Sequence, residues 1–141
     1  MDEFSVLLVD DEREFLETLM KRLKKRNLKV TGVGSGEDAL KVLKETPPDV
    51  VVLDVRMDGM DGIQTLREIK KVRPLVEVIM LTGHANMEVA VEGMEVGAFD
   101  YLMKPMDIDE LLYKLEDAYK RKTIQEQKIK HLEEEKKLEG V

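Results

Sequence analysis

The chain has 141 residues, of which 43% are hydrophobic and 38% charged, with a formal net charge of −7 and no cysteine. This length suits one domain with a hydrophobic core and is too short for two. No apolar run approaches the roughly 20 residues that a membrane span needs. Because the chain has no cysteine, disulfides and thiolate metal sites are excluded. The lack of cysteine and the acidic start favour the cytoplasm, and the net negative charge argues against a nucleic-acid-binding surface on this chain.

Short apolar runs bounded by turn residues predict five buried strands. In chain order they are expected over residues 6–9, 28–33, 50–53, 78–81 and 101–103. The first three helices are predicted after Asp11, with Phe15 and Leu23 among its apolar positions, then from the N-cap Ser35 to about residue 46, and over residues 63–72. Two more helices are predicted over about residues 86–95 and from near Asp107.

Five strand–helix alternations predict an α/β domain with a parallel sheet between two helical layers and right-handed crossovers. The common strand order for such a flavodoxin-like (βα)5 sandwich is 2-1-3-4-5, and its ligands bind at the carboxyl ends of strands 1 and 3. Asp10 and Asp11 follow the first predicted strand, and Asp54 follows the third. The fold prediction and the placement of the acidic residues therefore point to the same edge of the sheet.

These polar residues suit phosphoryl chemistry. Three neighbouring carboxylates repel one another, and a divalent cation relieves that repulsion. Ligands that are all oxygen atoms favour Mg²⁺ or Mn²⁺ over zinc. An ionised Asp54 can act as a nucleophile and form an aspartyl phosphate. Lys104 can neutralise charge on the transferring oxygens, and Thr82, at the end of the fourth predicted strand, can donate a hydrogen bond to one of them.

Taken together, Asp10-Asp11, Asp54, Thr82 and Lys104-Pro105, at these intervals, resemble the receiver domain of two-component response regulators, over about residues 4–119. The stretches 81–85 and 98–105 are most similar to receivers of the NtrC-like transcriptional activators. One position departs from the family, since Asp58 stands where proline is common.

The resemblance implies a phosphorelay. A sensor histidine kinase or a phosphotransfer protein would donate a phosphoryl group to Asp54, with self-catalysed phosphorylation and dephosphorylation rather than enzymatic turnover. Asp11, Asp54 and the backbone carbonyl of Arg56 would ligate Mg²⁺ or Mn²⁺. Asp10 would belong to the same metal site and act largely through a metal-bound water.

The resemblance also implies roles for residues of the last two strands. Lys104 would contact the phosphoryl group and precede a cis peptide bond to Pro105. Thr82 and Tyr101 would form a switch pair, in which the hydroxyl moves to the phosphate and the aromatic ring turns inward. The switch would alter a protein-binding or homodimerisation surface on the fourth helix, fifth strand and fifth helix.

The chain is predicted to consist of a receiver domain at residues 1–119 and a C-terminal helical extension at residues 120–141. A 3-4 spacing typical of a heptad seam runs from Ile108 through Leu111, Leu115, Ala118, Lys122, Gln125, Ile129 and Leu132, with two polar members, Lys122 and Gln125, in the middle. The extension is either a solvated helix that frays or a dimerising coiled coil or linker. In the second case it would lead toward an output domain that regulates transcription.

Other functions fit less well. A haloacid-dehalogenase-like phosphatase would need a second aspartate where Arg56 stands, and a flavodoxin-like cofactor site would need a phosphate-binding first loop in place of Asp10-Asp11. A receiver that scaffolds without phosphorylation is disfavoured because the acceptor set is complete. Asp10-Asp11 taken alone could simply cap the first helix.

Overall fold

The computed structural model describes residues 3–56, 61–83 and 87–140. The departure at Asp58 lies outside these ranges. Within them five strands alternate with five helices, in the order β1 (Ser5–Val9), α1 (Arg13–Lys24), β2 (Lys29–Val33), α2 (Gly36–Glu45), β3 (Val50–Asp54), α3 (Gly62–Val72), β4 (Glu77–Thr82), α4 (Met87–Val96), β5 (Asp100–Met103) and α5 (Ile108–Glu139). The predicted strands are confirmed to within one residue at each end.

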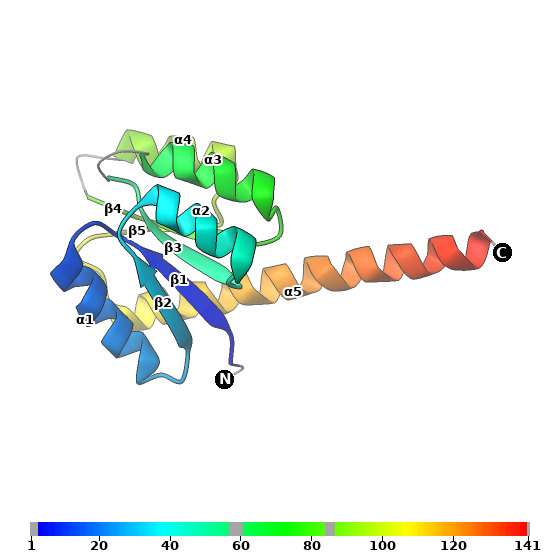
Figure 1. Ribbon diagram of the computed structural model, residues 1–141, viewed down its shortest axis with the longest axis horizontal. Coiled ribbons are helices and arrows are strands. Elements are labelled where there is room, and N and C mark those ends of the chain that lie inside the picture. The colour runs from blue at the N-terminus through cyan, green and yellow to red at the C-terminus, as the bar shows by residue number, and fades with distance from the viewer. Residues whose placement is uncertain (1–2, 57–60, 84–86, 141) are drawn as a thin grey trace.

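The strands form one parallel sheet in the order β2-β1-β3-β4-β5. Helices α1 and α5 cover one face of this sheet, and α2, α3 and α4 cover the other (Figure 1). The predicted flavodoxin-like three-layer arrangement is therefore confirmed. Its central strands are buried on both faces, which explains why their sequences are continuous apolar runs rather than alternating ones.

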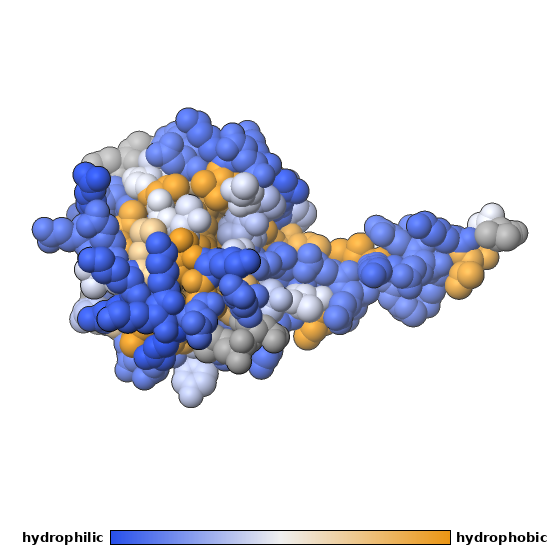
Figure 2. Space-filling model, turned by 60° about the horizontal axis from the view of Figure 1, so that its bottom comes forward, coloured by the Kyte–Doolittle hydropathy of each residue, from blue (hydrophilic) through white to orange (hydrophobic). Residues whose placement is uncertain are grey.

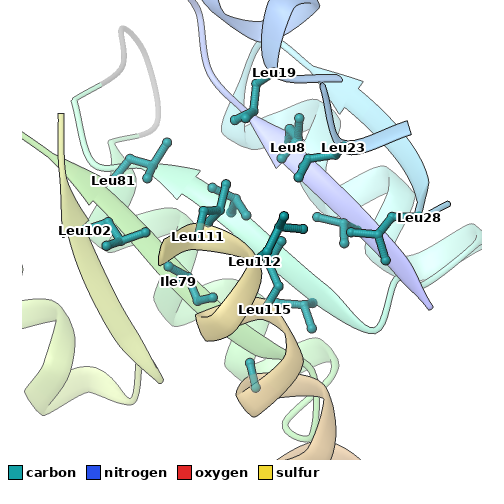
Figure 3. Packing of buried hydrophobic residues seen from close by; sticks show 14 of the residues in the cluster. Leu8, Leu19, Leu23, Leu28, Ile79, Leu81, Leu102, Leu111, Leu112 and Leu115 are labelled. Atoms are coloured by element: carbon teal, nitrogen blue, oxygen red, sulfur yellow. The ribbon is translucent and has the colours of Figure 1, made fainter. Parts of the chain in front are cut away.

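Alternate side chains of each strand enter two separate hydrophobic cores. Leu8 and Ile79 face the layer of α1 and α5, where they pack with Leu111 and Leu115 of α5 (Figure 3). Leu7 packs on the opposite face with the buried residues of α2, α3 and α4. Because helices pack on both faces, the sheet fixes the positions of the strand ends from which the loops at its carboxyl edge begin.

Local signals set several helix ends. The Ser35 hydroxyl accepts a hydrogen bond from the Asp38 amide at 3.1 Å, which confirms the predicted N-cap of α2. At the start of α3, a Cβ on Gly62 would lie 2.4 Å from the Cα of Val55. Only glycine permits this close approach of the helix to the backbone just after Asp54.

Helix α5 is much longer than the other helices and extends beyond the sheet (Figure 1). Two cations tie it to the amino ends of the strands: Lys122 Nζ lies 3.1 Å from Asp49 Oδ1, and Arg121 Nε lies 3.2 Å from Glu77 Oε2. Within the described residues the extension is helical through Glu139. The two alternatives for this extension, a solvated helix that frays and a dimerising coiled coil or linker, stay predictions.

The outer part of α5 carries isolated apolar residues. Ile129 and Leu132, on the predicted seam, are exposed, as are Ile124 and Leu138. Figure 2 shows apolar patches along an otherwise hydrophilic extension. Among the helices of the described ranges, none is both long enough and apolar enough to cross a membrane.

Candidate functional site

Three aspartates meet at the carboxyl edge of the sheet. Strands β1 and β3 are neighbours with Val9 paired to Leu53, so the residues that follow, Asp10 and Asp54, lie side by side. One carboxylate oxygen from each of Asp10, Asp11 and Asp54 lies within 4.8 Å of the others. Asp10 is 3% and Asp54 5% exposed, whereas Asp11 is exposed. The cluster is therefore desolvated on its inner side and open to solvent on its outer side.

Local hydrogen bonds orient the two buried carboxylates. Asp10 Oδ1 accepts the Glu12 amide at 2.9 Å, and Asp54 Oδ1 accepts the Arg56 amide at 3.0 Å. In each aspartate, Oδ1 accepts a hydrogen bond from a backbone amide of the loop that follows, and Oδ2 lies near Lys104. Asp10 does not cap α1, because Glu12 occupies the N-cap position and the helix begins at Arg13.

The environment of Asp54 disfavours its charged form. The pKa of Asp54 is raised from 3.8 to about 6, mainly by burial and also by the charges of Asp10 and Asp11. The Arg56 amide and the Lys104 ammonium act in the opposite direction. A divalent cation at the cluster would favour the ionised carboxylate, and so would make Asp54 a better nucleophile.

Lys104, in the loop after β5, brings a positive charge to the cluster. Its Nζ lies 3.0 Å from Asp10 Oδ2, 3.7 Å from Asp54 Oδ2 and 3.9 Å from Glu12 Oε1. Burial by itself would lower the pKa of Lys104, but the hydrogen bond to Asp10 and the surrounding carboxylates raise it above its usual value. The side chain therefore stays protonated at neutral pH. The peptide bond from Lys104 to Pro105 is cis, as the resemblance implied.

The two residues of the predicted switch pair lie on neighbouring strands. Thr82 ends β4 and is 1% exposed, with its hydroxyl donating to the Gly83 carbonyl at 3.2 Å. Its carbonyl accepts the Lys104 amide at 2.8 Å, which ties the end of β4 to the lysine loop. Tyr101 lies on β5 opposite Met80 and is half-buried against the core under α2, α3 and α4. Both residues therefore lie on the β4–β5 side of the sheet.

Sequence reasoning missed two contacts of Lys104. Glu12 lies in its ion-pair range, and the ring of Phe15 lies 4.2 Å from its Nζ, measured to the ring centroid. Phe15 was predicted only as an apolar helix position. The available signal was the aromatic side chain of Phe15, one helical turn after Asp11. Its contact with Lys104 could not be predicted from local sequence, because the two residues are almost ninety positions apart.

The donor set fits a hard divalent cation. All three clustered side chains offer carboxylate oxygens, which Mg²⁺ and Mn²⁺ prefer, and their exposed side leaves room for retained waters. Arg56 contributes an amide hydrogen bond to Asp54; the ligand role of its carbonyl stays a prediction. The arrangement brings three carboxylates that could hold a metal ion and the ammonium of Lys104 into one cluster.

Comparison with known proteins identifies close relatives of this arrangement. The family model described as the response regulator receiver domain matches residues 6–116. The transcriptional regulatory protein ZraR of Escherichia coli K12 is 41% identical over 117 residues, which is 83% of this chain and 26% of that protein. The DNA-binding transcriptional regulator NtrC of the same strain is 40% identical over 113 residues, covering 80% of this chain and 24% of that protein.

A solved structure supports the same relationship. The crystal structure of a response regulator receiver domain protein from Clostridium thermocellum superposes with a TM-score of 0.83 at 34% identity, covering 86% of this chain and 98% of that one. By contrast, this chain spans about a quarter of the length of the curated relatives it matches.

Proposed function

The chain belongs to the response regulator receiver domain family, and from this premise we propose that it is a phosphorylation switch whose phosphoacceptor is Asp54. Domains of this family are phosphoacceptor signalling domains and not classical enzymes. The phosphoryl donor would be a sensor histidine kinase or a phosphotransfer protein. The observation that carries the proposal is the burial of Asp54 between two further aspartates and the Lys104 ammonium.

The metal site would be formed by Asp10, Asp11 and Asp54, with the backbone carbonyl of Arg56. A bound Mg²⁺ or Mn²⁺ would neutralise negative charge on the transferring phosphoryl oxygens. The carboxylate cluster and its all-oxygen chemistry support this assignment. Asp10 would contribute from the inner side, where it also holds Lys104.

The transfer itself needs little from the protein beyond position and charge. Asp54 Oδ2, the oxygen not bonded to the Arg56 amide, would form a bond to phosphorus while the bond from phosphorus to the donor breaks. The donor would leave with the bonding electron pair. Lys104 Nζ, 3.7 Å from Asp54 Oδ2, would contact one phosphoryl oxygen, and the Thr82 hydroxyl would donate a hydrogen bond to another.

Phosphorylation would then change the surface made by α4, β5 and α5. The phosphoryl group adds roughly two negative charges, and Thr82 would move toward them while Tyr101 turns inward. Val91 and Met94 on α4 are 56% and 38% exposed, so this face already presents apolar area to a protein partner. The change would favour protein binding or homodimerisation.

We also propose that residues 1–119 form the receiver and residues 120–141 an extension that joins it to an output domain. Exposed Ile129 and Leu132 continue the stripe by which Leu115 and Ala118 pack on the sheet, which supports a coiled-coil dimer along α5. The relatives named above are transcriptional regulators, so transcription is the expected output, with DNA contacts made outside this chain. The expected cytoplasmic location stays a prediction.

A small-molecule phosphodonor tests the proposal without knowledge of the cognate kinase. Wild-type protein incubated with acetyl phosphate and Mg²⁺ is expected to gain the mass of one phosphoryl group, and EDTA should abolish the gain. Asp54→Asn should stay unmodified, while the matched variant Asp61→Asn, at the N-cap of α3, should be modified. Equal modification of Asp54→Asn and wild type would overturn the assignment of Asp54.

A further inference from the structure

Phe15 is an uncharged neighbour of the Lys104 ammonium. Its ring, carried by α1, lies 4.2 Å from Lys104 Nζ, well inside the range at which a ring face attracts a cation. The ring is half-buried and packs against the core under α1 and α5, so its position is fixed by that core. The other cation–ring pair in the described part of the chain, Arg121 over Phe99, is wider at 5.8 Å.

The ammonium also has three acidic partners among the described residues. Asp10, Asp54 and Glu12 lie 3.0, 3.7 and 3.9 Å from Lys104 Nζ. Lysine is a point charge on a flexible stem, so its position follows whichever neighbour is most negative. Metal binding or phosphorylation would change the charge of those carboxylates and hence the balance of forces on the ammonium.

We propose that Phe15 is a positioning residue, which holds the Lys104 ammonium beside Asp54 while the charges of the surrounding carboxylates change. The ring carries no charge of its own, so its attraction for the ammonium does not depend on the metal ion or the phosphoryl group. A divalent cation bound to Asp10 and Asp54 would weaken their attraction for the Lys104 ammonium. The ring would then keep the ammonium within reach of a phosphoryl oxygen on Asp54. A group held in place before the reaction stabilises developing charge without reorganisation.

This inference rests on the proposed function, and its test compares side chains of similar size at position 15. With saturating Mg²⁺ and acetyl phosphate, Phe15→Leu and Phe15→Met are expected to be phosphorylated about 3 to 20 times more slowly than wild type. Phe15→Tyr keeps a ring and should stay within about twofold of wild type. The matched control is Phe4→Leu, because Phe4 is buried in the same core and stacks on Tyr119 instead.

Proton NMR tests the contact between the ring and the lysine directly, whereas the rates of Phe15→Leu and Phe15→Tyr test what the ring does. The ε-methylene protons of Lys104 should be shifted upfield by the ring in wild type and in Phe15→Tyr, and should lose that shift in Phe15→Leu. This measurement needs no phosphorylation and is made on wild type even where a variant folds poorly.

The outcomes separate this inference from the proposed function. If wild type is phosphorylated but both aliphatic variants react as fast, or Phe15→Tyr reacts as slowly as they do, Phe15 is a packing residue only. Wild-type Lys104 methylene protons at ordinary shifts would overturn the inference in the same way. A wild type that never accepts a phosphoryl group, with the upfield shift present, would instead reject the proposed function and keep the ring–lysine contact.

Discussion

Replacing Asp54 with asparagine should stabilise the metal-free protein, and the gain should grow with pH. The folded protein keeps a proton on Asp54 up to a pKa of about 6, whereas the unfolded chain releases it near the ordinary value of 3.8. Between these values the unfolded state therefore binds fewer protons than the folded state, so that rising pH favours unfolding. Above the folded pKa the cost of the buried charge reaches its full size.

The size of the effect follows from the two pKa values. Their difference corresponds to a cost of about 3 kcal/mol once Asp54 is fully ionised in both states. At about pH 5 roughly half of this cost is present, so the advantage of Asp54→Asn should increase by about 1 to 2 kcal/mol between about pH 5 and about pH 8. Mg²⁺ should shrink the advantage, because a bound cation offsets the buried charge.

Urea unfolding in EDTA over this pH range, followed by circular dichroism, measures the difference directly. Asp117→Asn is the matched control, because it removes one carboxylate from the exposed side of α5. The reasoning would be refuted by an Asp54→Asn advantage that stays constant with pH, or by a variant that is less stable than wild type at the alkaline end in EDTA.

Three further perturbations probe the metal site, the loop after β3 and the base of α5. At ten times its dissociation constant Mg²⁺ should raise the free energy of unfolding by about 1.4 kcal/mol, as measured by thermal denaturation, and Asp11→Asn should lose most of that gain; an equal gain in the variant would remove Asp11 from the site. Gly62→Ala should cost about 1–3 kcal/mol in urea unfolding, because its Cβ would lie 2.4 Å from the Val55 Cα. Gly34→Ala, whose Cβ meets its nearest neighbour at 3.9 Å, should cost less, and equal losses would contradict this explanation. Lys122→Met should destabilise the protein by about 1–2 kcal/mol, since it leaves Asp49 without the ammonium at 3.1 Å. The exposed Lys128→Met is the comparison in that urea series, where a similar loss would show that the Lys122–Asp49 pair adds nothing.

The sequence was sufficient for the strands, their order and the meeting of the acidic residues at one edge. Buried parallel strands require continuous apolar runs such as residues 50–53, and the residue that ends such a run must lie at the carboxyl edge. The proximity of Asp10 and Asp54 follows from the pairing of β1 with β3. The cis bond before Pro105 came from the family resemblance and not from local chemistry.

The contacts that the sequence did not reveal join residues far apart in the chain. Lys122 looked like a polar interruption of a heptad seam, yet it is 13% exposed and paired with Asp49, 73 residues away. No periodicity within α5 encodes that partner, because it depends on where the helix crosses the amino ends of the strands. The ring of Phe15 over Lys104 escaped prediction for the same reason.

The most direct measurement of the central claim is a crystal structure of the protein with Mn²⁺ and beryllofluoride, which mimics an aspartyl phosphate. Anomalous scattering is expected to place one Mn²⁺ among the carboxylates of Asp10, Asp11 and Asp54, with beryllium bonded to Asp54 and Lys104 Nζ on a fluoride. Beryllofluoride on another residue, or Mn²⁺ bound away from this cluster, would contradict the assignment of Asp54 as the phosphoacceptor.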